Sequence, residues 1–77
     1  MITIEYDKQA DAAYIYLIKE EERTAGWVKK TYPCDPSEVN GMINLDFDNN
    51  GCLGGIEVMD ASKKLSQEIL DQAETIG

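Results

Sequence analysis

The segment from residue 42 to 48, MINLDFD, alternates strictly between apolar and polar side chains. This period of two constrains the fold more than any other feature, because it places Ile43, Leu45 and Phe47 on one face of an extended chain. The DNNG that follows supplies turn-forming side chains, and residues 53–59, LGGIEVM, have the composition of a returning strand. The sequence therefore predicts a β-hairpin with one apolar and one polar face.

The register of this hairpin depends on the length of its loop. A four-residue loop sets Phe47 opposite Cys52 and Asp46 opposite Leu53, and it keeps the apolar residues of both strands on one face. A three-residue loop would instead set the apolar residues opposite Glu57. Hydrophobic consistency favours the four-residue loop, although the glycine pair at 54–55 could carry a bulge that changes the register.

Three stretches before the hairpin also have strand character. They are residues 2–6 (ITIEY), 12–19 (AAYIYLIK) and 27–33 (WVKKTYP), all rich in β-branched and aromatic side chains. The middle stretch is apolar on both faces, so we expect a central strand that is covered on both sides. Beyond the third stretch, Asp35 is expected to cap a short helical turn that begins at Pro36.

The last part of the chain has helical periodicity. Asp60 resembles an N-cap, and an apolar stripe with spacings of four, four and three follows it. The stripe consists of Leu65, Ile69, Ala73 and Ile76. We expect this stripe to dock on a face of the sheet, with packing on a partner chain as the alternative.

These elements define the predicted fold. We expect a single small α+β domain over residues 1–77, with a mostly antiparallel meander sheet of four to five strands over about residues 2–59. A C-terminal helix over about residues 61–76 is expected to pack on one face of that sheet.

The charge balance limits the partners of this chain. It has 7 basic and 15 acidic residues and a formal net charge of −8. Such a surface repels phosphate backbones and anionic lipid heads, so we expect no nucleic-acid or membrane binding. The negative charge either serves solubility alone or complements the surface of a basic partner protein. Because the N-terminal residues resemble no signal peptide and no run approaches the ~20 apolar residues of a membrane span, we predict a cytoplasmic protein.

Residues 46–57, DFDNNGCLGGIE, fit the pattern of an EF-hand calcium loop. An EF-hand needs a helix on each side, whereas both flanks here alternate like strands. In the four-residue-loop register Glu57 also lies about 13 Å along the sheet from the level of Asp46, too far to share one ion. We therefore predict no metal site and no cofactor, and we keep a weak calcium site at Asp46, Asp48 or Asn50 as an alternative.

The sequence offers little support for catalysis. It contains no histidine, and its 2 cysteines, Cys34 and Cys52, lack the spacing of a zinc site or an activated thiol. Asp7 and Asp11 could form an acid and base pair, but aspartates beside a strand connection more commonly hydrogen-bond the turn. A chain this short would also struggle to enclose a deep pocket. We therefore predict that the protein is not an enzyme.

Four groups of residues resemble the family called the domain of unknown function 2283 (DUF2283), over about residues 2–59. They are Tyr6 and Asp7; Ala10, Asp11, Tyr14 and Ile15; Asn44, Leu45, Asp46, Asp48 and Gly51; and Gly55, Ile56, Glu57 and Val58. The resemblance implies a compact β-rich single domain without an established activity. Because some members are encoded beside small basic toxin-like proteins, it also suggests an antitoxin-like role. Gly54 departs from the pattern, in which a bulkier apolar residue is usual, so the packing of that strand is left open.

From these observations we predict a small acidic protein-interaction module that self-associates and neutralises a basic protein. A homo-oligomer that binds a small ligand is the alternative. The predicted interaction residues are Asp7, Asp11, Asn44, Asp46, Asp48 and Glu57.

Overall fold

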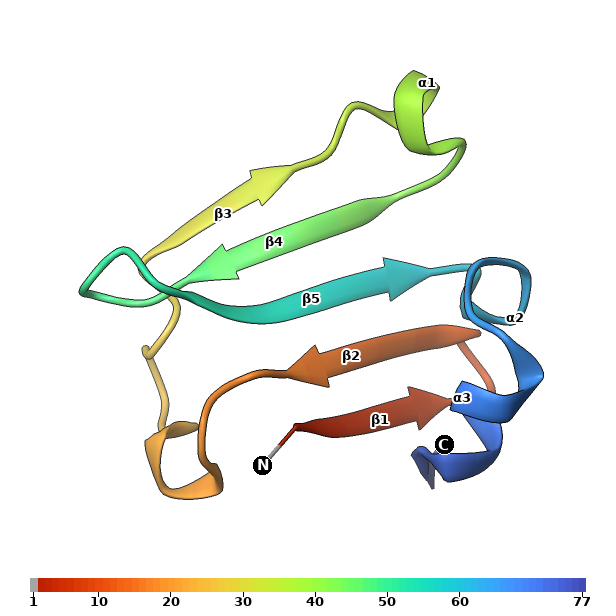
Figure 1. Cartoon of the computed structure of the whole chain (residues 1–77), viewed down its shortest axis with the longest axis horizontal. Coiled ribbons are helices and arrows are strands. Elements are labelled where there is room, and N and C mark those ends of the chain that lie inside the picture. The colour runs from red at the N-terminus through yellow and green to blue at the C-terminus, as the bar shows by residue number, and fades with distance from the viewer. Residues whose placement is uncertain (1) are drawn as a thin grey trace.

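The computed structural model describes residues 2–77 as one mixed sheet with short helices at its ends (Figure 1). The strands are β1 (Thr3–Asp7), β2 (Ala12–Tyr16), β3 (Lys30–Pro33), β4 (Ile43–Phe47), β5 (Leu53–Met59) and β6 (Glu74–Ile76). The helices are η1 (Glu20–Glu22, a 3-10 turn), α1 (Pro36–Val39), α2 (Ala61–Lys64) and α3 (Gln67–Gln72). The α+β class is confirmed. None of the helices in this part of the chain is long and apolar enough to cross a membrane.

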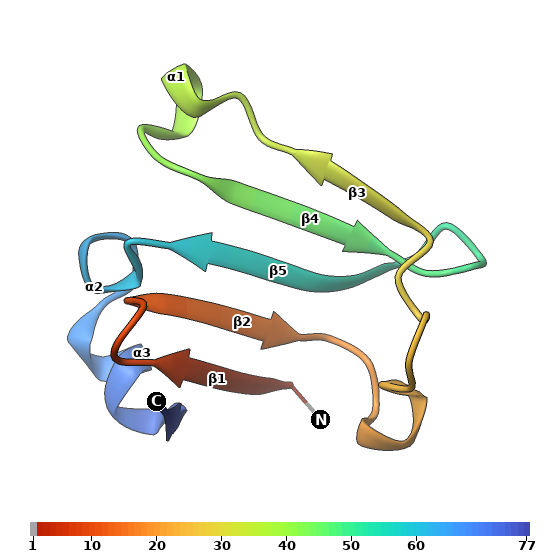
Figure 2. The same cartoon turned by 180° about the vertical axis from the view of Figure 1, so that it is seen from behind.

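The strand order differs from the predicted meander. The six strands lie in the order β3-β4-β5-β2-β1-β6, so β2 pairs with β5 rather than with β3 (Figures 1 and 2). The sheet is mostly antiparallel as predicted, but it has six strands rather than four to five, because β6 adds to the outer edge of β1 in parallel. The second strand does lie at the centre of the sheet as predicted, although it ends at Tyr16 rather than at Lys19.

The predicted helix over about residues 61–76 is interrupted twice. Leu65 is extended, and the Ser66 side chain accepts a hydrogen bond from the backbone N–H of Ile69, which begins a separate helix. After Ala73 the chain is extended again and forms β6, so Ile76 belongs to the sheet. Asp60 has φ 52° and makes no side-chain cap bond, so its predicted N-cap role is also wrong.

The helical turn after β3 is as predicted. It begins at Pro36, and the Asp35 side chain accepts a hydrogen bond from the backbone N–H of Ser37 at 3.0 Å. Asn40 then ends the turn in the left-handed region, which asparagine tolerates better than most residues.

The hairpin of β4 and β5 has the predicted faces but different pairs. Leu45 lies opposite Ile56 and Ile43 opposite Val58, so the apolar residues do share a face. The register shifts between Asp46 and Phe47, which face Gly55 and Leu53 rather than Leu53 and Cys52. The predicted four-residue loop is wrong, because the Asp48 N–H donates to the Cys52 carbonyl and leaves only residues 49–51 in the loop, which moves the pairs by one residue. The bulge at Gly54 moves Asp46 and every later pair by one more.

The two faces of the sheet differ sharply in composition. A central row of five apolar residues crosses five adjacent strands, and a second row beside it contains Tyr6, Ala13, Val58 and Ile43. The central row is Ile4, Ile15, Ile56, Leu45 and Tyr32. These two rows define the apolar face. The opposite, polar face carries Thr3, Glu5, Tyr14, Tyr16, Asn44, Asp46, Glu57 and Thr31.

The buried core lies at one end of the apolar face. Ala13 on β2 forms a cluster with Ala61 and Leu70 of the C-terminal helices, and Tyr6 and Leu65 pack against it. Figure 1 shows these helices in front of one end of the sheet, with the rest of that face uncovered. The expectation that β2 is covered on both sides is therefore wrong, and Ile15 is only half-buried.

Candidate functional site

The candidate site is a network of hydrogen bonds on the polar face, centred on Asp46 of β4. Asp46 is 8% exposed, and its two carboxylate oxygens accept from different neighbours. Tyr14 Oη donates to Oδ2 at 2.5 Å, and Thr31 Oγ1 donates to Oδ1 at 2.6 Å. Thr31 lies on β3, next to β4, whereas Tyr14 lies on β2 and reaches Asp46 across Gly55 of the intervening strand β5, so the sheet itself fixes the position of the carboxylate.

This arrangement determines the charge states of the network. Burial is the largest cause that raises the pKa of Tyr14, followed by its hydrogen bond to Asp46 and the negative charge there. Ionisation of the phenol is therefore even less favourable than in an ordinary tyrosine, and the hydroxyl remains a donor. Both donors to Asp46 are neutral hydroxyls, and the carboxylate therefore brings a net negative charge to this face.

A second pair extends the network to Glu57 of β5. Asn44 lies directly opposite Glu57, and its Nδ2 donates to Oε1 at 2.8 Å. Glu57 also neighbours Tyr14, which in turn faces Glu5 on β1. A shallow pocket of about 130 Å³ lies here, lined in part by Glu5, Asp7, Tyr14 and Glu57. The polar face thus offers several carboxylates to one concave surface.

The structure unites only part of the predicted interaction set. Asn44, Asp46 and Glu57 lie together, and Glu57 is nearer to Asp46 than predicted because its partner is Asn44. Asp7 reaches the same face at the pocket, but its Oδ1 accepts from the backbone N–H groups of Gln9 and Ala10, as expected for a turn.

Asp11 has a separate structural role at the end of the sheet. Its carboxylate accepts from Tyr6 Oη at 2.7 Å and from both the N–H and the hydroxyl of Ser62, at 3.0 and 2.7 Å. The hydrogen bond from Tyr6, followed by those from Ser62, lowers the pKa of Asp11. Asp11 therefore ties the turn after β1 to the start of α2.

Asp48 belongs to the hairpin turn rather than to the network. Its Oδ1 accepts from the N–H groups of Asn50 and Cys52, both at 2.9 Å, which closes the loop between β4 and β5. Within residues 2–77, no group of three or more carboxylate, thiol or imidazole side chains is arranged to hold a metal ion. In the calcium-like string, Asp48 therefore serves the turn, whereas Asp46 and Glu57 belong to the polar-face network.

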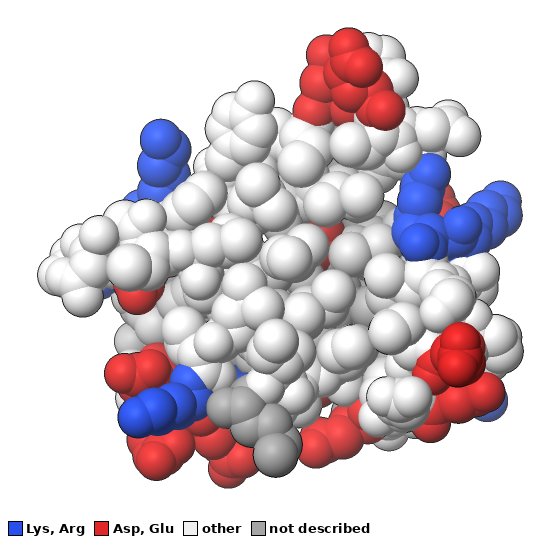
Figure 3. All heavy atoms as spheres, in the orientation of Figure 1, with Lys and Arg blue, Asp and Glu red and all other residues white. Residues whose placement is uncertain are grey.

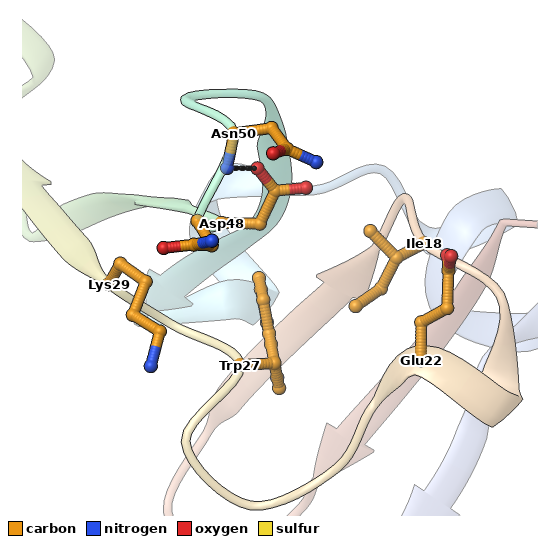
Figure 4. Close-up of a pocket in the computed structure, with 7 residues that line it drawn as sticks. Ile18, Glu22, Trp27, Lys29, Asp48 and Asn50 are labelled. Carbon is orange, nitrogen blue, oxygen red and sulfur yellow. Dashed lines mark hydrogen bonds between the residues drawn. The ribbon is translucent and has the colours of Figure 1, made fainter.

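A second hollow lies beside this turn (Figure 4). It measures about 200 Å³ and is lined by Ile18, Glu22, Trp27, Lys29, Asp48, Asn49 and Asn50. Figure 4 shows the Trp27 ring between Lys29 and Ile18, with the Asp48–Asn50 turn above it. The hollow therefore combines an aromatic surface with one ammonium group and two carboxylates.

Sequence reasoning missed Tyr14 and Thr31 as site residues. The alternation in residues 12–19 did place Tyr14 and Tyr16 on one face, but nothing local links that face to Asp46, which is 32 positions away. Thr31 joins the network only because β3 pairs with β4 in a register that sets it opposite Asp46.

A comparison with protein families decides the classification. A family model described as a protein of unknown function, DUF2283, matches residues 3–62. The chain belongs to the DUF2283 family. The match runs from β1 to Ser62, so it includes the polar-face network of this DUF2283 protein and ends before α3 and β6. No curated protein and no solved structure matches the chain.

Proposed function

We propose that this DUF2283 protein is an interaction module that binds a basic protein through the polar face of its sheet. The observation that carries the proposal is the position of Asp46 and Glu57, which accept hydrogen bonds from the neutral groups of Tyr14, Thr31 and Asn44. Their negative charge is held in place without being neutralised by these donors. Lysine or arginine side chains of a partner would supply the missing positive charge.

The rigidity of the network supports this reading. Carboxylates on flexible surface side chains lose conformational entropy when they bind a cation, and such pairs contribute little free energy. Asp46 is buried and Glu57 is half-buried, and strand pairing places both, so less entropy remains to be lost. Arginine, with its planar set of donors, suits such a preorganised group of acceptors best.

An antitoxin-like role is one biological setting for this binding. A protein that covers the basic surface of its partner would block that surface from binding nucleic acid or anionic membranes, because these depend on the same positive charge. Neutralisation in this sense requires only a tight, charge-complementary complex, and it requires no catalytic group in the module.

The proposal can be tested by titrating isotope-labelled protein with an arginine-rich decapeptide and following amide chemical shifts. We expect salt-sensitive shifts at Thr31, Asn44 and Glu57. Glu57→Gln should weaken binding about fivefold, which corresponds to ~1 kcal/mol, whereas Glu21→Gln removes the same charge from the exposed η1 and should have a smaller effect. Equal weakening by both variants would mean that binding follows net charge alone, and the proposal would be wrong.

Small-ligand binding is a second candidate, favoured by the hollow at Trp27. An aromatic carboxylate could place its ring against Trp27 and its charge near Lys29, both of which line the hollow. Trp27 is the chain's only tryptophan, so its fluorescence reports on this place. Benzoate should change the fluorescence of the wild type and not of Lys29→Gln. An unchanged wild-type signal up to millimolar benzoate would exclude this class of ligand.

A further inference from the structure

The apolar face is the largest feature that neither the polar network nor the hairpin turn explains. Its central row crosses the middle of the sheet, yet Ile15, Ile56 and Leu45 are only half-buried. Toward its margins, Tyr32 is 54% exposed. Leu53 extends the face at the hairpin end, where it lies opposite Phe47, and is 38% exposed. Figure 3 looks onto this face and shows uncharged side chains across its middle, with the acidic and basic side chains around the rim.

The total accessible surface of the molecule indicates how much area a second layer could cover. The chain exposes 5334 Å², whereas a folded monomer of 8.6 kDa is expected to expose about 4,700 Å². The excess is about 600 Å², close to the roughly 800 Å² that each partner buries in a standard protein interface. The principal extents of 32 × 29 × 18 Å describe a slab whose broad side, about 900 Å², is large enough for such an interface.

We propose that this face is covered by the same face of a second copy of the chain, which forms a two-fold symmetric dimer of two stacked sheets. In such a dimer each copy supplies the second layer that the other lacks, at the spacing of about 10 Å that is usual for stacked sheets. The central rows of Ile and Leu would then form the core of the assembly. The dimer would bury half-exposed aliphatic side chains against their own counterparts.

Two observations favour a second copy over a different partner. Within residues 2–77 the buried apolar side chains are Ala13, Val58, Ala61 and Leu70, which is a small core for a domain of this size. A second layer would therefore stabilise the fold, and another copy of the chain is always available to supply it. The charged rim in Figure 3 also surrounds an uncharged centre, so two net-negative copies can stack without burying like charges at that centre.

The proposed dimer does not depend on the basic partner, because it uses the opposite face. The two polar faces would both point outward, each with its own Asp46 network. A titration that shows no peptide binding would not argue against the dimer, and a protein found to be monomeric could still bind the peptide. The two proposals are therefore tested independently.

The dimer is tested first by light scattering on the purified chain. We expect a mass of twice 8.6 kDa at about 100 μM, and a shift to the monomer mass for the double variant Tyr32→Glu, Leu53→Glu. Ile76→Glu is the matched control, since Ile76 is 49% exposed and lines the pocket on the polar face. It should stay dimeric. A wild-type mass of one chain, or a double variant that stays dimeric, would overturn the proposal.

A second measurement covers the case in which the double variant does not fold. If folding and dimerisation are coupled, the midpoint of thermal unfolding of the wild type must rise with protein concentration, by roughly 9 °C for a hundredfold increase. A monomer would unfold at the same temperature at every concentration. A concentration-independent midpoint together with the mass of one chain would overturn the dimer, whatever the variant does.

Discussion

Asp46 is buried in the sheet and satisfied by hydrogen bonds from neutral hydroxyl groups. The bonds from Tyr14 on β2 and Thr31 on β3 to Asp46 on β4 join three strands across the polar face. A buried carboxylate that loses a donor keeps its desolvation cost, so the network is sensitive to single substitutions.

We predict that Tyr14→Phe lowers the free energy of unfolding by about 1 to 3 kcal/mol, because it leaves one oxygen of Asp46 without its donor. Tyr16→Phe is the matched control: it removes a hydroxyl from the same strand and face, and it keeps the ring over which Arg23 lies at 4.3 Å. The control should change stability by less than about 0.5 kcal/mol. Urea denaturation measures both, and equal losses would contradict the importance of the Tyr14–Asp46 bond.

Asp11 leads to a prediction about acid stability. Its pKa is lower in the folded chain than the ordinary value of 3.8, so its ionised form stabilises the fold above that pH. This contribution is lost as the pH falls through the lowered pKa. Asn tolerates the positive φ of 51° at this position, so Asp11→Asn removes the charge without straining the backbone.

We therefore expect Asp11→Asn to be less stable than the wild type at pH 7 and to lose less of its remaining stability on acidification. Urea denaturation between pH 7 and pH 2 would measure the difference between the two proteins. If the difference stays constant down to the lowest pH, the Asp11 carboxylate does not contribute in its ionised form.

At the scale of elements, the packing of Trp27 against β5 explains why glycine stands at position 54, where the family pattern has a bulkier residue. A Cβ built at Gly54 would lie 2.5 Å from Cζ3 of Trp27 and 3.1 Å from Cγ2 of Ile18. The indole ring therefore occupies the space that a bulkier residue at 54 would fill. The segment before β3 thus completes the packing of β5 from outside the hairpin.

This packing predicts a strong coupling between the two positions. Gly54→Ala should cost about 1 to 3 kcal/mol of stability, since it overpacks the contact with the indole ring. In a Trp27→Leu background the same substitution should cost less than half as much. A double-mutant cycle by urea denaturation gives the coupling energy. Additive effects would show that Trp27 does not restrict position 54.

At the scale of the whole molecule, the net charge of −8 opposes compaction. We expect the thermal midpoint to rise by several degrees between about 0.05 M and about 0.5 M NaCl, since salt of this range screens charges beyond a few ångströms. A variant in which Glu20, Glu21 and Glu22 are all changed to Gln has three fewer negative charges at the exposed η1. Its thermal midpoint should rise less with salt. A midpoint that is insensitive to salt would mean that charge repulsion does not limit stability.

Much of the local structure follows from short stretches of sequence. The alternation in residues 43–47 predicts both the strand and its two faces, and Asp35 with Pro36 predicts the short helix after β3. These features depend on side chains within a few positions of one another, which is the range over which strand pleating and helix capping act.

The partners of each strand, however, were decided only by the tertiary structure. The addition of β6 to β1, the pairing of β2 with β5 and the bond from Tyr14 to Asp46 all join residues that are distant in sequence. An amphipathic stripe predicts one helix over residues 61–76. Ser66 instead caps a second helix, and residues 74–76 pair with the outer edge of β1. The residues by themselves therefore determined an acidic α+β chain with one apolar and one polar sheet face. Long-range packing decided which carboxylates meet on the polar face and how much of the apolar face the helices cover, and no local pattern encodes that packing.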